Sequence, residues 1–171
     1  MKRIVSVLAV AALMAVMMVT MAGQAIARDF DCNKTAPEAC NGTDNSDNIG
    51  GNDQPNLIYG NRGDDVIRGR GGNDELHGGG GNDRLYGGEG NDELYGGGGN
   101  DDLYGGAGND VLMDTVGGND RDRLYGGEGD DYLNAFDKDP RDLLDGGADT
   151  DTCDGDPGDN YQSCETINRL T

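Results

Sequence analysis

An aspartate recurs every nine residues along much of this chain, and each time it follows a glycine-rich segment. Between Gly78 and Met113, four consecutive units read GGGGNDRLY, GGEGNDELY, GGGGNDDLY and GGAGNDVLM. A carboxylate is a hard oxygen ligand, and Ca²⁺ takes about six to eight oxygen ligands at roughly 2.3–2.6 Å. Glycines permit left-handed backbone conformations that direct several carbonyl oxygens toward one point. Carboxylates set in glycine-rich turns therefore predict bound calcium ions.

Nine-residue units can be followed from Gly42 to Asp154, with two short insertions at 114–116 and 135–136. The units are 42–50, 51–59, 60–68, 69–77, 78–86, 87–95, 96–104, 105–113, 117–125, 126–134, 137–145 and 146–154. The sixth residue of each unit is the candidate calcium ligand: Asp47, Asp65, Asp74, Asp83, Asp92, Asp101, Asp110, Asp122, Asp131, Asp142 and Asp151. The second unit departs from this pattern, because Asn56 stands at its sixth position.

The eighth position of every unit is apolar. This column consists of Ile49, Ile58, Ile67, Leu76, Leu85, Leu94, Leu103, Leu112, Leu124, Leu133, Leu144 and Cys153. A disordered glycine-rich linker would not keep one position apolar throughout, and the collagen pattern of glycine at every third residue is absent. Six turn-like residues followed by three strand-like residues predict an all-β fold. We expect a parallel β-solenoid whose core is this column.

The units resemble those of the RTX, or haemolysin-type calcium-binding, family. The resemblance covers residues 42–154 and rests on five consecutive close copies of the motif. It implies a right-handed parallel β-roll in which two nonapeptides form one coil, so that the array would have about six coils. Odd-numbered units would form one sheet and even-numbered units the other. With strands about 4.8 Å apart, the array would be roughly 30 Å long.

The resemblance also implies how calcium is held. Each ion would lie between successive turns on the same side, bound by the aspartates of two units and by main-chain oxygens, with about five to eight ions in all. Glycine holds the fourth position throughout units three to eight and again at Gly129. It is replaced elsewhere by Asn45, Gln54, Asp120, Pro140 and Asp149. Metal binding should therefore weaken toward both ends of the array and near the insertions.

The overall composition explains why the metal would be needed. The chain has 171 residues, of which 32 are glycine, carries a net charge of −20, and contains no Trp and two Phe. Low hydrophobicity with high net charge is typical of disordered chains, and only the regular period argues against disorder here. We therefore expect folding to be coupled to calcium binding. The acidic charge also argues against nucleic acid and anionic membrane surfaces as partners.

The first 27 residues have the features of a secretory signal peptide. Lys2 and Arg3 precede an apolar stretch, residues 4–21, and residues 25–27 match the small-x-small cleavage pattern. Arg28 would then begin a secreted, extracellular chain with no membrane segment. The alternative is an uncleaved anchor, because 18 apolar residues nearly span a bilayer. A signal of this type departs from the RTX family, whose members commonly use an uncleaved C-terminal signal.

Four cysteines flank the repeats. An even number in a secreted chain predicts disulfides, and three connectivities are possible. We favour Cys32–Cys40 and Cys153–Cys164, because each closes a short local loop. These bonds would then lie in or beside an N-terminal cap, 28–41, and a C-terminal cap, 155–171, which cover the open ends of the solenoid. A zinc site is disfavoured, because the spacings are eight and eleven and His77 is distant in sequence.

The ninth position carries Tyr59, His77, Tyr86, Tyr95, Tyr104, Met113 and Tyr125. With two units per coil, Tyr86, Tyr104 and Tyr125 would stack on one sheet, and the others, from Tyr59 to Met113, would line the second. The favoured interpretation is an aromatic ladder that shields the sheet. The alternative is a face that binds a glycan or a cell-surface protein, as in an adhesin.

Nothing in the repeats predicts catalysis. The chain has no HExxH motif and no nucleophile elbow, and His77 stands where other units carry tyrosine. The many carboxylates are assigned to calcium by their period, so we expect a structural or binding module that is not an enzyme. An ice-binding face is disfavoured, because no rank of threonine exists, although a rank of asparagine occupies the fifth position from Asn73 to Asn109.

Overall fold

The computed structural model describes residues 29–32 and 39–169. The predicted signal segment, 1–27, lies outside these residues. Within the described part of the chain, no helix has the length and apolar character needed to cross a membrane.

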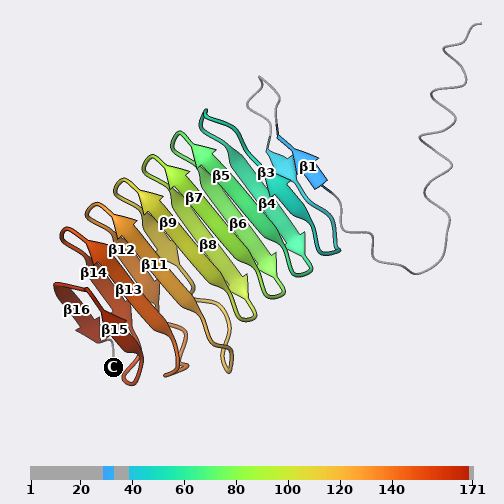
Figure 1. Cartoon of the computed structure of the whole chain (residues 1–171). Helices are drawn as coiled ribbons and strands as arrows, with labels where there is room; N and C mark the ends of the chain where they lie inside the picture. Colours follow the sequence, from blue (N-terminus) through green and yellow to red (C-terminus); the bar gives the residue numbers. More distant parts are fainter. Residues whose placement is uncertain (1–28, 33–38, 170–171) are drawn as a thin grey trace, which may run out of the picture.

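Among the described residues, all regular elements are short strands (Figure 1). They are β1 Asp29–Asp31, β2 Cys40–Asn41, β3 Asn48–Gly50, β4 Leu57–Arg62, β5 Val66–Gly71, β6 Glu75–Gly80, β7 Arg84–Glu89, β8 Glu93–Gly98, β9 Asp102–Ala107, β10 Val111–Met113, β11 Arg123–Glu128, β12 Tyr132–Ala135, β13 Leu143–Ala148, β14 Thr152–Gly155, β15 Asn160–Gln162 and β16 Thr166–Arg169. Odd-numbered strands form one sheet and even-numbered strands form the other, each in sequence order. The predicted parallel β-solenoid is confirmed.

Each strand pairs in parallel with the strand one coil further along. In β7 and β9, for example, Leu85 lies opposite Leu103 and Tyr86 lies opposite Tyr104. The register therefore places equivalent positions of alternate units side by side, as two units per coil require. The twelve units supply β3 to β14, and the flanking segments continue both sheets with β1 and β2 at one end and β15 and β16 at the other.

The strands are longer than the sequence predicts. In a regular coil a strand has six residues and runs through positions seven to nine and on into the first three positions of the next unit, as in β7, Arg84–Glu89. The leading glycines thus continue the ladder, and Gly88 pairs with Gly106. Only positions four to six remain for the turn. Gly90, in the fourth position, has φ of 128°, a left-handed conformation that favours glycine.

The core is a single column of aliphatic side chains between the two sheets. All members of the eighth-position column, from Ile49 to Cys153, are fully buried. Inward-facing positions alternate along the chain, so that the sixth and first positions of neighbouring units also point inside. These two inward positions hold aspartate and glycine in the regular units, so they add no apolar side chain to the core. The core is consequently thin and has carboxylates on its border.

Disulfides close both ends of the solenoid. Cys32 is bonded to Cys40, with a Cα–Cα distance of 5.8 Å, and Cys153 is bonded to Cys164, with a Cα–Cα distance of 6.0 Å. This is the connectivity favoured by the sequence. Cys153 also fills the last buried place of the core column.

The two insertions leave the register intact. Leu103 still lies opposite Leu124 across the first insertion, and Leu124 lies opposite Leu144 across the second, although each of these coils is longer than in the regular part. Asp114 follows β10 and Ala135 ends β12, both as buried residues, and the turns that come next hold the remaining extra residues. The insertions therefore change the turns and not the stacking.

Candidate metal centre

The candidate ligands form two columns at the turns, one for each set of alternate units. The odd column contains Asp47, Asp65, Asp83, Asp101, Asp122 and Asp142, and the even column contains Asp74, Asp92, Asp110, Asp131 and Asp151. Every one of these side chains is at most 3% exposed. The solenoid thus brings all eleven predicted ligands into two buried rows of carboxylates.

Hydrogen bonds link the aspartates within each column. The main-chain N–H of Asp65 donates to Oδ1 of Asp83 at 2.8 Å, and the N–H of Asp83 donates to Oδ1 of Asp101 at 2.6 Å. The even column repeats the arrangement, with the N–H of Asp74 donating to Asp92 at 2.8 Å. One oxygen of every carboxylate after Asp47 is therefore satisfied by the preceding coil.

The second carboxylate oxygen is different. Oδ2 has no hydrogen-bond partner, although it is buried, in Asp65, Asp74, Asp83, Asp92, Asp101, Asp110, Asp131, Asp142 and Asp151. At the N-terminal end of the odd column, Oδ2 of Asp47 instead accepts hydrogen bonds from the N–H and the hydroxyl of Thr43. A buried anionic oxygen without a donor is strongly unfavourable. Each such oxygen requires a cation or a proton.

Main-chain oxygens converge on the same places. A Cβ built on Gly87 would lie closer than 3.0 Å to Oδ2 of Asp92 and 2.6 Å from the carbonyl oxygen of Gly105. Gly60 and Gly78, which also begin their units, border equivalent spaces between an aspartate and a glycine carbonyl one coil further along. The donor set is made of hard oxygens from both carboxylates and carbonyls, the set that calcium prefers. The residues present fit calcium.

Burial sets the protonation of these carboxyls. It raises the pKa of Asp74 and Asp83 from the ordinary value of 3.8 to about 7, and that of Asp122 to about 8. Neighbouring carboxylates in the same column add to the rise, although the main-chain N–H bond lowers it. In Asp65 and Asp131 burial raises the pKa to about 6. Without a cation, the columns would therefore hold protons near neutral pH.

Sequence reasoning missed the continuation of both columns into the C-terminal cap. The N–H of Asp142 donates to Oδ1 of Asp159 at 3.2 Å, and the N–H of Asp151 donates to Glu165 at 2.8 Å. The sequence feature that could have revealed it is an eight-residue unit at 155–162. Gly155, Gly158 and Asp159 match the first, fourth and sixth positions of the motif, and the fifth position is missing. At the other end, Asn56 begins the even column without a charge, and its N–H donates to Asp74 at 2.7 Å.

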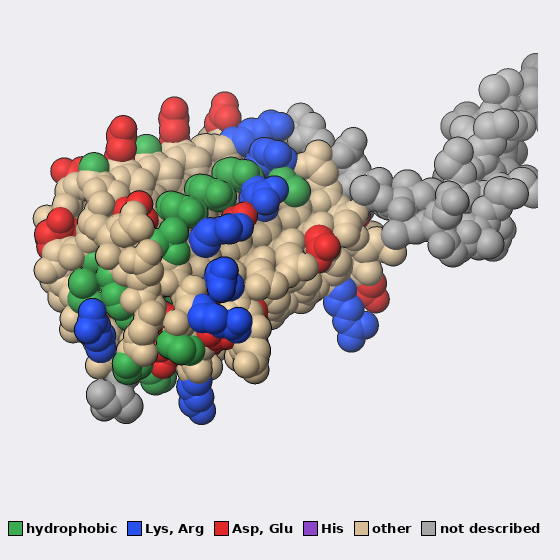
Figure 2. Space-filling view, turned by 60° about the horizontal axis from the view of Figure 1, so that its bottom comes forward, with side chains coloured by type: hydrophobic (Ala, Val, Ile, Leu, Met, Phe, Trp, Pro, Cys, Tyr) green, Lys and Arg blue, Asp and Glu red, His purple; other side chains and the backbone are tan. Residues whose placement is uncertain are grey.

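The tyrosine faces are arranged as the ladder interpretation predicts. Tyr86, Tyr104 and Tyr125 stack with ring centroids 4.9 Å apart, and His77 stacks between Tyr59 and Tyr95 at 4.5 and 4.7 Å. All are partly exposed. Figure 2 shows hydrophobic side chains, a class that includes tyrosine, gathered in a row across one face with basic side chains beside them.

Charged residues precede the stacked rings Tyr86, Tyr104 and Tyr125 on adjacent strands, and they form ion pairs with one another. Asp102 accepts from Arg84 at 3.2 Å and from Arg123 at 2.6 Å. His77 bonds Glu75 through Nε2 at 2.8 Å. The two arginine side chains are about half exposed, although Asp102 is buried, and solvent around the arginines screens these pairs. His77 thus contacts Glu75 while it stacks between Tyr59 and Tyr95.

Comparison with known proteins supports calcium as the metal that the repeats bind. A family model for the RTX calcium-binding nonapeptide repeat matches four times, at residues 41–76, 77–112, 116–137 and 141–161. These matches span more than half of the chain and include both cleanly repeated and interrupted units. A search of the curated proteins gave no match. The chain belongs to the RTX calcium-binding nonapeptide repeat family.

Proposed function

We propose that this protein is a secreted calcium-binding module that folds when it binds calcium. The observation that carries the proposal is the set of buried Oδ2 atoms without partners, which lie beside glycine carbonyls in both columns. Bound calcium supplies the positive charge that these oxygens require and joins successive coils through shared ligands. The module acts as a structural or binding element and not as an enzyme.

The ligands of the proposed ions are the eleven sixth-position aspartates, together with main-chain oxygens of the turns. About five to eight ions would occupy the two columns. The thin core makes this metal a condition for folding, because the aliphatic column alone buries little surface for a chain of net charge −20. The aspartates hold the ion, and the glycines leave room for it.

The proposed organisation of the chain follows from the same argument. Residues 1–27 are a secretory signal, 28–41 are an N-terminal cap, 42–154 are the calcium-binding roll and 155–171 are a C-terminal cap. Two disulfides support an extracellular location, because such bonds persist in oxidising compartments.

Circular dichroism during a calcium titration tests the coupling of folding to binding. The disulfide-bonded chain, after chelation with EDTA at a pH above the raised pKa values of the columns, should lack an ordered β-sheet signal. It should gain that signal cooperatively as calcium rises into the submillimolar to millimolar range. Magnesium at equal concentration is the control, since it demands stricter octahedral geometry and retains its waters. A β-rich spectrum that does not change in EDTA would contradict the proposal.

A second candidate function uses the rows of stacked rings. Their partial exposure and regular spacing would suit an extended glycan or a cell-surface protein, as in an adhesin. Glycan-array binding that disappears in Tyr86→Ala plus Tyr104→Ala, with the calcium-induced dichroism retained, would support this role. Binding that is unaffected by these substitutions would leave the rings with a purely structural role.

A further inference from the structure

The first insertion places an aspartate where regular units begin with glycine. The N–H of Asp114 donates to the carbonyl oxygen of Asn134 at 2.8 Å. First-position glycines make the same bond, from Gly42 to Tyr59 and from Gly51 to Arg68, both at 2.7 Å. Asp114 therefore occupies a first position, where a side chain must point into the solenoid, and it is only 1% exposed.

The carboxylate of Asp114 enters a space that a main-chain carbonyl borders in the regular coils. At Gly78 the space that a Cβ would fill is bordered by Oδ2 of Asp83 and, at 2.7 Å, by the carbonyl oxygen of Gly96. At Gly96 the corresponding neighbours are Oδ2 of Asp114 and, at 2.7 Å, Oδ2 of Asp101. Two carboxylates thus meet where the regular coils bring together one carboxylate and one carbonyl.

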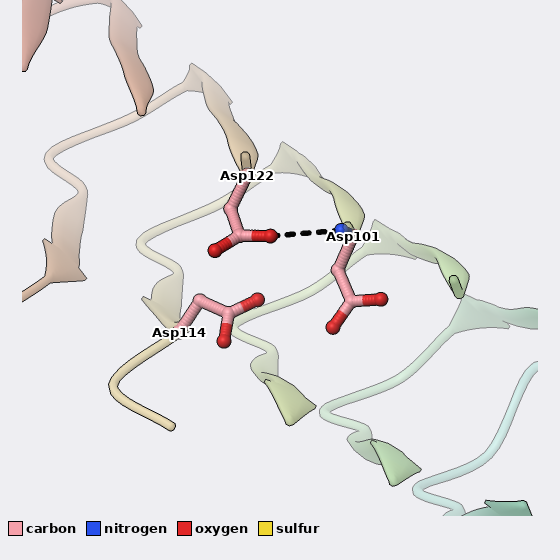
Figure 3. Close-up of side chains that lie close together, drawn as sticks. All are labelled: Asp101, Asp114 and Asp122. Carbon is pink, nitrogen blue, oxygen red and sulfur yellow. Dashed lines mark hydrogen bonds between the residues drawn. The ribbon is translucent and has the colours of Figure 1, made fainter. Parts of the chain in front are cut away.

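A third carboxylate completes the group. Asp101, Asp114 and Asp122 each offer an oxygen, and these atoms lie within 4.8 Å of one another (Figure 3). The figure shows the three side chains directed toward one another from separate turns, with the N–H of Asp101 bonded to Asp122 at 2.9 Å. Asp122 also belongs to a second group, with Asp120 and Asp137, beside the first.

The group lacks any charge compensation in the structure. Oδ2 of Asp101 and Oδ2 of Asp114 are buried without a hydrogen-bond partner. Among residues 29–32 and 39–169, no Lys, Arg or His side chain forms an ion pair with Asp101, Asp114 or Asp122. Three buried carboxylates at this separation repel one another strongly unless a cation or a proton lies among them.

We propose that Asp101, Asp114 and Asp122 form a distinct calcium site that binds more tightly than the regular sites and fills first. The inference rests on the proposed function and adds to it an order of calcium affinity among the sites. Calcium affinity in proteins depends on the number of charged ligands and on the rigidity of the site. This site has three side-chain carboxylates, whereas the regular family arrangement brings together two aspartates and several main-chain oxygens. The first ion would thus order the coils on both sides of the insertion.

Isothermal titration calorimetry on the chelated, disulfide-bonded full chain tests the rank order. The unsubstituted protein should show one ion bound on the order of tenfold or more tightly than the rest. Asp114→Gly, which restores the residue that regular units carry, should remove only this tight class. Asp114→Asn, which keeps the shape and removes the charge, should do the same. Both variants should reach the full dichroism signal at saturating calcium.

Asp83→Asn, in a regular turn, is the matched control. It should lose or weaken a site of the weaker class and keep the tight one. A single class of sites in the unsubstituted protein, or a tight class that survives in both Asp114 variants, would overturn the inference while leaving calcium binding itself in place. Complete absence of calcium binding would instead overturn the proposed function and this inference together.

Discussion

The main-chain N–H of Asp83 donates to Oδ1 of Asp101, 18 residues further along the chain, at 2.6 Å. This bond orients each carboxylate of the column, because it engages one oxygen and leaves Oδ2 inside the turn. The same relationship recurs in the even column, where the N–H of Asp92 donates to Asp110 at 2.8 Å. The backbone of one coil therefore orients the proposed ligand of the next, so the proposed sites depend on the stacking of the coils.

Removing one carboxylate from the regular part should weaken calcium-dependent folding. Asp92→Asn retains the hydrogen-bonding shape but removes the charge of a buried side chain with an unpartnered Oδ2. The calcium concentration at the folding midpoint should rise on the order of tenfold, since affinity follows ligand charge. The matched control is Glu89→Gln, an exposed carboxylate at the end of β7. Equal midpoints for the two variants, measured by circular dichroism, would contradict the role of Asp92.

Filling the space beside a first-position glycine should have a large effect. In Gly87→Ala, the new methyl group would collide with Oδ2 of Asp92 and with the carbonyl oxygen of Gly105. We expect a loss of about 1–3 kcal/mol in the free energy of unfolding, measured by urea denaturation in saturating calcium. Gly98→Ala is the control, because a Cβ there meets nothing within 4 Å and the backbone is not left-handed. If the Gly87→Ala and Gly98→Ala variants are equally stable, the space beside Gly87 is not needed for the stability of the fold.

The metal-free protein should become more ordered as the pH falls. Burial raises the pKa of Asp74, Asp83 and Asp110 to about 7 in the folded state, from 3.8. The folded form therefore binds more protons than the unfolded form between these values, and its stability falls as the pH rises through them. Without calcium, β-sheet dichroism should be strongest near pH 4 and should disappear between about pH 6 and 8.

The same shifts predict that calcium displaces protons. Near pH 6.5, calorimetric heats should depend on the ionisation enthalpy of the buffer, because protons leave the carboxyls as the metal enters. At pH 9 this dependence should vanish. Heats that are independent of the buffer at both pH values would contradict the protonation of the empty columns.

The N-terminal disulfide should stabilise the end of the solenoid. Cys32 and Cys40 close a loop with a sequence separation of eight, for which chain entropy predicts about 2.5 kcal/mol. The double variant Cys32→Ser plus Cys40→Ser should lose stability of this order in saturating calcium, measured by urea denaturation. Calcium stoichiometry should be retained. A simultaneous loss of several ions would instead show that the cap is required for the whole array.

Most of the fold could be predicted, because the period fixes the core column and the resemblance to the RTX family implies the pairing of alternate units. This pairing placed Leu85 opposite Leu103 and Tyr86 beside Tyr104, as observed. The strand length was not predicted. The leading glycines look like turn residues by composition, but Gly88 continues the strand because its backbone still pairs with Gly106.

The departures from the period were harder to interpret. Asp114 looked like an inserted loop residue, whereas the preceding strand carries it into a first position. Asp159 was assigned to the C-terminal cap and not to a repeat, because its unit is one residue short. In both cases the position of the residue is determined by hydrogen bonds to the neighbouring coil. The residues of that coil are distant in the sequence, so the nearby sequence does not reveal the position.

X-ray diffraction from crystals grown with calcium tests the central claim most directly, because anomalous scattering locates each ion. We predict about five to eight ions in two rows, each roughly 2.3–2.6 Å from an aspartate Oδ2 of the odd or even column. Ordered turns from Asp65 to Asp131 with no ion beside these oxygens would contradict the account.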